Sequence, residues 1–142
     1  MRKIFRANEY PGLLIRLAVG LVFLSEGLQK FLYPGMLGGG RFAKLGINPP
    51  VFWADFTGVF EISCALLIIS GFFTRLAVVP LLIIMVVAFI TTKWPLLLDK
   101  GFWPMLHEGR TDFVLTMLLI FLFIYGTGHR YTDFIRYAKG KN

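Results

Sequence analysis

The stretch VFWADFTGVFEISCALLIISGFFTRLAVVPLLIIMVVAFITT, residues 51–92, decides the fold of this chain. It consists of two long apolar runs that meet at a tight turn around Thr74-Arg75, and Trp94-Pro95 is expected to end the second run. The first run exceeds the ~20 residues that a helix needs to cross a bilayer, and the second lies near the lower limit. Because so short a turn makes the two helices antiparallel neighbours, the stretch predicts a helical hairpin within a membrane.

One further apolar segment lies on each side of this hairpin. The segment before it begins near Pro11 and ends at Pro34-Gly35, which are typical start and stop signals of a helix. The segment after it is closed by Gly126 and is the shortest of the four. We therefore expect one all-α domain over 1–142, an integral membrane four-helix bundle. Its expected elements are helices at about 11–33, 51–73, 76–92 and 112–126, joined by long outer loops at 34–50 and 93–111.

The composition supports a membrane protein. The 142 residues are 56% hydrophobic and 16% charged, well below the roughly 25% charged residues of soluble domains. The net charge of +7 would suggest nucleic acid as the partner of a soluble domain. Here the basic residues lie at the chain ends and in the connections, where they meet lipid headgroups. The expected partner is therefore the lipid bilayer and not nucleic acid.

The distribution of basic residues predicts the orientation. The two termini and the tight turn hold eight lysines and arginines, whereas the two long loops hold five. The positive-inside rule then places both termini in the cytoplasm and the long loops outside. The expected localisation is a bacterial-type cytoplasmic (inner) membrane, with several passes. The eight inner residues are Arg2, Lys3, Arg6, Arg75, Arg130, Arg136, Lys139 and Lys141, and the five outer ones are Arg41, Lys44, Lys93, Lys100 and Arg110.

Cysteine and histidine are too few for an intrinsic electron carrier. The chain has one cysteine, Cys64, within an apolar segment, and two histidines that fall near opposite membrane faces. This set predicts no disulfide relay, haem or metal site. If the protein takes part in electron transfer, the carrier has to come from elsewhere, and a quinone is the expected candidate.

Several ionisable residues lie within the predicted spans, where each costs roughly 2.5 to 3.5 kcal/mol on insertion. Arg16 and Lys30 are close enough to the helix ends to reach the headgroups, and Glu26 and Lys30 have the i,i+4 spacing of a structural ion pair. Asp55, at the outer start of the second helix, is read as structural. Glu61 lies near mid-bilayer and therefore needs an internal partner, a ligand or a proton.

The first helix has one face that combines glycines with ionisable groups. Arg16, Gly20, Phe23, Gly27 and Lys30 fall within about 80° of arc, and the two glycines allow close approach of a neighbour. We expect this face to line a polar cavity that opens to the outside, with the second helix's carboxylate as its floor.

The outer segment before the fourth helix brings further polar groups to the mouth of this cavity. His107 can act as a proton shuttle, although a solvated loop explains it equally simply. Arg110 and Asp112 are expected to pair with Glu26 and Lys30.

Short motifs along nearly the whole chain resemble the DoxX family of small membrane proteins. They are RLAVGLVFLSEGLQKF at 16–31, GRFAKLGINPP at 40–50, GVFEISCALLIISGFFTR at 58–75, TTKWP at 91–95 and HEGRTDF at 107–113. The resemblance implies four membrane helices and highlights Arg16, Gly27, Lys30, Glu61 and Arg75. It also implies redox association, since the family is named for a subunit of a thiosulfate:quinone oxidoreductase. The tail departs from the family's usual G-x-G-x-x-S-L-D by lacking the leucine.

The leading functional hypothesis is a non-autonomous subunit of a membrane oxidoreductase that binds a small redox-active or lipophilic ligand, with a quinone as the expected one. In that role Glu61 and Glu26 handle protons. The expected ligand-binding residues are Arg16, Lys30, Arg110, Asp112, His107, Phe23, Trp53 and Trp103. One alternative is a proton-coupled transporter or exporter of a small solute. The other is a membrane scaffold that anchors soluble enzymes, and a homo-oligomer fits each of the three.

Overall fold

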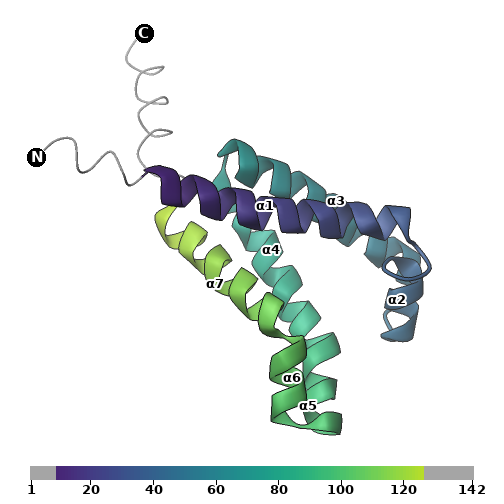
Figure 1. The fold of residues 1–142 in the computed structure, drawn as a ribbon. Helices are drawn as coiled ribbons and strands as arrows, with labels where there is room; N and C mark the ends of the chain where they lie inside the picture. The colour runs from purple at the N-terminus through teal and green to yellow at the C-terminus, as the bar shows by residue number, and fades with distance from the viewer. Residues whose placement is uncertain (1–8, 127–142) are drawn as a thin grey trace, which may run out of the picture.

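The computed structural model describes residues 9–126, and all regular structure in this range is helical (Figure 1). Its elements, in chain order, are α1 (Glu9–Leu32), α2 (Gly39–Lys44), α3 (Pro50–Ser70), α4 (Thr74–Ala88), the π-helical turn η2 (Phe89–Lys93), α5 (Trp94–Lys100), α6 (Phe102–Glu108) and α7 (Arg110–Tyr125).

The helices form two antiparallel pairs that diverge from one end (Figure 1). The pair α1 and α3 has the most extensive packing, and the short α2 packs against α3. The second pair is α4 and α7, and the α5–α6 hairpin forms its far end. We call the shared end, with the 71–74 turn and Tyr125, the turn end. The opposite end, with α2 and the α5–α6 hairpin, is the cleft end.

Three helices in the described range are long and apolar enough to cross a membrane. They are Gly12–Leu32, Pro50–Ser70 and Thr74–Lys100, and the last combines α4, η2 and α5. The fourth apolar helix, α7, has 16 residues and is shorter than these three. The chain is thus an all-helical membrane protein with several apolar helices.

Proline and glycine set the two ends of α3, and the helix ends at Ser70, three residues before the expected end. Pro50 occupies the first turn of α3, where its missing N–H costs nothing. Gly71 ends α3 with a φ of 83°, a left-handed conformation that glycine adopts without strain. The next helix begins at Thr74, so the turn between α3 and α4 is as tight as expected.

The expected stop of the third helix at Trp94-Pro95 is wrong, since the helix continues to Lys100. The π-helical turn η2 explains how it passes the proline. In this turn the N–H of Trp94 donates to the carbonyl of Phe89, five residues back. The wider turn relieves the clash between a proline ring and the carbonyl four residues before it.

The two connections expected to be loops also contain helices. Residues 34–50 include α2, whose first turn holds Gly39 and Gly40, and residues 93–111 are largely α5 and α6. Gly101 separates α5 from α6 with a φ of 90°, which lets the chain fold back on itself. Apart from Gly126, the glycine-containing tail motif lies outside the described residues.

The core lies where the four long helices meet, nearer the turn end. It consists of buried side chains from all four, and α4 contributes the most. They are Val19, Phe23, Cys64, Ala65, Ile68, Ala77, Val78, Leu81, Met85, Leu115, Leu119 and Leu122.

Candidate functional site

A buried ion pair joins α1 to α3. The ammonium nitrogen Nζ of Lys30 lies 2.7 Å from Oε2 of Glu61, and the two side chains are 10% and 5% exposed. The prediction that Glu61 needs an internal partner is therefore matched by a specific contact. Since both charges are removed from solvent and lipid, their pairing is what makes their burial tolerable.

Two glycines bring the backbones of α1 and α3 close enough for this pair. A Cβ added at Gly27 would lie 2.9 Å from the carbonyl oxygen of Gly58 and 2.7 Å from a side-chain carbon of Ile62. A Cβ added at Gly58 would lie 2.8 Å from the ring of Phe31. Small residues at such positions are how membrane helices pack tightly. The close approach puts Lys30 within reach of the neighbouring helix.

The structure does not form the expected side-chain pair between Glu26 and Lys30. The Glu26 side chain is exposed, and Lys30 contacts this residue only through its backbone carbonyl, at 3.5 Å. The physical reason is that Lys30 turns inward to Glu61. Phe23, expected to contact a ligand ring, is 2% exposed and belongs to the core.

Arg16 lies toward the turn end and therefore far from Lys30, since fourteen helical residues at 1.5 Å each span about 20 Å. Its Nε is buried without a hydrogen-bond partner among the described residues. The single polar cavity expected along α1 is thus replaced by separate features at its two ends.

The expected pairing of Arg110 and Asp112 with α1 is also wrong. Asp112 pairs instead with Lys93, whose Nζ lies 3.3 Å from Oδ2, and Arg110 donates to the backbone carbonyl of His107 at 2.7 Å. The reason is the helical course of 93–111, because η2 carries Lys93 directly to the start of α7. Arg110 and Asp112 consequently form these contacts with α6 and η2 and not with α1.

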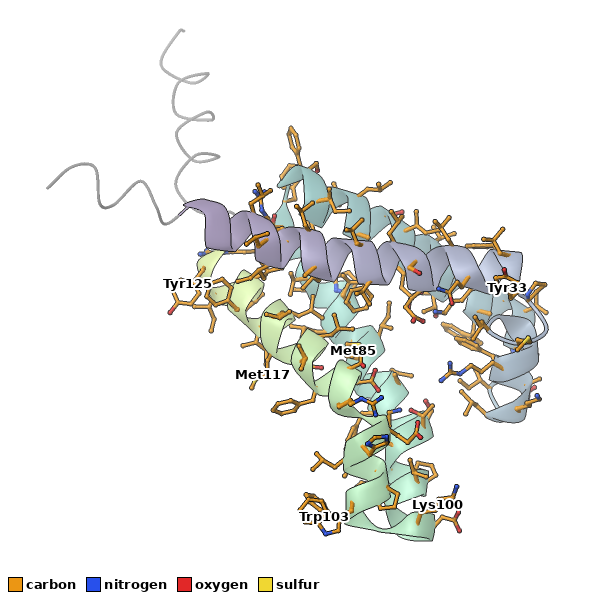
Figure 2. All side chains as sticks on the ribbon, in the orientation of Figure 1. Tyr33, Met85, Lys100, Trp103, Met117 and Tyr125 are labelled. Carbon is orange, nitrogen blue, oxygen red and sulfur yellow. The ribbon has the colours of Figure 1, made fainter. Side chains whose placement is uncertain are left out.

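A cleft of about 580 Å³ lies at the cleft end. It is lined by residues of α2, η2, α5 and α6, three of them fixed cations and one a carboxylate. Figure 2 shows Lys100 and Trp103 at the far tip of the α5–α6 hairpin. The lining residues are Arg41, Thr92, Lys93, Leu96, Lys100, Trp103, Pro104, His107 and Glu108.

The cleft unites two predicted ligand-binding residues, His107 and Trp103, with three cations that the sequence analysis used only to orient the chain. Arg41, Lys93 and Lys100 are up to 59 positions apart in the sequence and converge because of α2 and the α5–α6 hairpin. The motif TTKWP, with its lysine between a polar pair and an aromatic residue, was the signal that could have drawn attention to this segment.

Trp53 does not line the cleft. It belongs to a row of aromatic rings on α3, with ring centroids 5.3 Å from Phe52 and 5.6 Å from Phe56. Phe60 continues the row toward mid-helix. All four rings are exposed on the surface of α3, so they are placed to contact lipid.

Comparison with known proteins adds two findings. Residues 12–94 match the profile of the DoxX family. A relative from Mycobacterium tuberculosis (strain ATCC 25618 / H37Rv), the uncharacterized membrane protein Rv3486, is 48% identical over 133 residues, which cover 89% of this chain and 82% of the relative. No solved structure shows a significant match to the chain.

Proposed function

The chain belongs to the DoxX family of membrane proteins, and we propose that it is a ligand-binding subunit of a membrane redox system. The proposed binding site, for a quinone headgroup, is the cleft between α2 and the α5–α6 hairpin. Three fixed cations and one carboxylate around one cleft are the observation that carries the proposal.

The cleft supplies the groups that a quinone needs. Its volume lies within the roughly 300 to 1,000 Å³ range of small-molecule sites. Trp103 offers an aromatic face, while Arg41 and Lys100 offer donors to carbonyl oxygens that become negative on reduction. His107 also lines the cleft, and its imidazole can carry the accompanying proton. In this scheme a partner protein exchanges electrons with the bound ligand.

Lys93 connects the cleft to the start of α7 through an ion pair. Its side chain lines the cleft and also pairs with Asp112 at the start of α7. It stands on η2, and π-helical turns are frequent at functional sites. A ligand that draws Lys93 away from Asp112 would thus loosen the contact between η2 and α7.

The binding test uses purified protein in detergent and a short-chain benzoquinone as the probe. We expect Lys100→Gln and Trp103→Leu each to raise the dissociation constant about tenfold, since each removes one contact worth ~1 to 2 kcal/mol. Lys44→Gln is the matched control, because Lys44 is exposed on α2 but does not line the cleft. Equal dissociation constants for all variants would refute the proposed site.

We further propose that α7 is a fourth span and that both termini lie in the cytoplasm of a bacterial cell. Its 16 residues extend about 24 Å, and they return the chain to the turn end beside α4. A cysteine at Gly35 tests the orientation, because a side chain there meets no atom within 4 Å. It should react with an impermeant thiol reagent from outside cells, whereas one at Gly140 should not. The reverse pattern would contradict the orientation.

A proton-coupled transporter is the second candidate, and the buried pair of Lys30 and Glu61 favours it. Protonation of Glu61 would release Lys30 and weaken the link between α1 and α3, which is the kind of movement that an exchanger needs. Solute uptake into liposomes that depends on a pH gradient, and is lost in Glu61→Gln, would support this candidate over a redox subunit.

A further inference from the structure

Among residues 9–126, two buried polar atoms lack a hydrogen-bond partner within that range, and both lie near the turn end, remote from the cleft. They are Nε of Arg16 and the hydroxyl oxygen of Thr74. Thr74 is only 3% exposed. A buried polar group without a partner costs about 1 to 3 kcal/mol, so both atoms indicate that this region receives polar groups from outside the described helices.

The register of α1 against α3 places these two residues at the same level. Gly20 lies against Ile69 and the carbonyl of Ala65. Arg16 is one turn nearer the turn end on the same face of α1. Since α3 runs in the opposite direction, Arg16 lies at the level of residues 69–73, directly before Thr74.

The start of α4 adds backbone donors to the same place. α4 has 15 residues, and its N-terminus has no side-chain cap. The first N–H groups of a helix lack partners inside the helix and carry partial positive charge, which favours an anion. Arg75, in this first turn, donates to the carbonyl of Ile124 and so holds the end of α7 beside α4.

Apolar side chains are also exposed at this end of the molecule. Leu14, Phe73 and Leu76 are each more than 60% exposed on the surface of the turn end. A helix end with exposed apolar residues lies at the boundary between acyl chains and headgroups. A phosphate with acyl chains attached therefore fits both the polar and the apolar parts.

From this arrangement we propose that Arg16, Thr74 and the N-terminus of α4 form a binding site for the phosphate of an anionic phospholipid. Arginine, a hydroxyl and free backbone N–H groups are recurrent ligands of phosphate. The leaflet that faces the cytoplasm is rich in anionic lipid, which agrees with the orientation proposed above. The site is independent of the cleft and of the ligand bound there.

Native mass spectrometry of the delipidated full chain, titrated with single lipids, tests the proposal. We expect phosphatidylglycerol to bind about tenfold more tightly than phosphatidylcholine. Arg16→Gln should remove this preference. Thr74→Val, which keeps the side-chain shape, should weaken the binding of phosphatidylglycerol about threefold. Arg110→Gln is the control at the other end of the molecule and should change neither value. If Arg16→Gln fails to fold, Thr74→Val alone tests the site, and unchanged phosphatidylglycerol binding in that variant would contradict it.

Three results would overturn the proposal. The first is equal binding of the two lipids by the unaltered chain. The second is complete competition by inorganic phosphate at millimolar concentration, because the site would then take free phosphate. The third concerns Asp133, the aspartate of the C-terminal tail. If the chain prefers phosphatidylglycerol only after Asp133→Asn, the carboxylate of Asp133 and not a lipid phosphate would be the natural occupant of the site.

Discussion

Removing one member of the buried pair between α1 and α3 should destabilise the protein more than removing both. The distance of 2.7 Å corresponds to an attraction of about 6 kcal/mol at an effective dielectric constant of ~20, most of which is offset by desolvation. We expect Lys30→Met to lower the free energy of unfolding by ~3 to 5 kcal/mol, because it leaves Glu61 without its cation. Glu61→Gln should cost less, since Lys30 stands in the last turn of α1 and can extend toward the headgroups.

The double variant should recover part of this loss, with a coupling energy of ~2 kcal/mol. Unfolding in mixed micelles with increasing sodium dodecyl sulfate measures all four species of the cycle. The matched control is the pair of Lys93 and Asp112, whose carboxylate is 38% exposed and whose coupling should stay below ~1 kcal/mol. A cycle of Lys30 with Glu26 should show almost none. Strict additivity of Lys30→Met and Glu61→Gln would refute the reasoning.

Two further predictions concern packing, and the same unfolding assay checks both. Gly27→Ala should lower the free energy of unfolding by ~1 to 3 kcal/mol, because its Cβ would lie 2.9 Å from the carbonyl oxygen of Gly58. The control is Gly12→Ala, which should be neutral or slightly stabilising because its Cβ would meet no atom within 4 Å. If Gly27→Ala is as stable as the unaltered protein, α1 and α3 can move apart at little cost and the close packing is not required. Leu119→Ala should cost ~2 kcal/mol or more, since Leu119 is fully buried, and Ile120→Ala on the neighbouring exposed position should cost less than ~1 kcal/mol. Similar losses at both positions would argue against the core described above.

The membrane character and the DoxX family could be predicted from the sequence because apolar length and charge are properties of single segments. The start of α3 at Pro50 could also be predicted, since a proline acts on its own turn, whereas the expected end near Phe73 lies three residues beyond the observed end at Ser70. The course of the helix past Pro95 could not, because it depends on the π-helical turn before it and not on the proline alone.

The candidate site was harder to predict for a related reason. Sequence reasoning identified Glu61 as a residue in need of a partner, but it also paired Lys30 with Glu26 on the same helix. The true contact joins residues 31 positions apart, and it depends on how closely Gly27 lets two backbones approach. That Arg41 and Lys100 line one cleft likewise depends on short helices that carry little hydrophobic signal of their own, α2 packed on α3 and α5 packed on α6.

The separation of Lys30 from Glu61 along the chain also has a consequence for biogenesis. During synthesis, Lys30 leaves the ribosome 31 residues ahead of its counter-ion. At roughly 5 to 20 residues per second this is a delay of about 2 to 6 s. For that time an unpaired cation at the end of α1 has to remain at the lipid surface or within the insertion machinery. We therefore expect α1 to take its final depth only when α3 arrives.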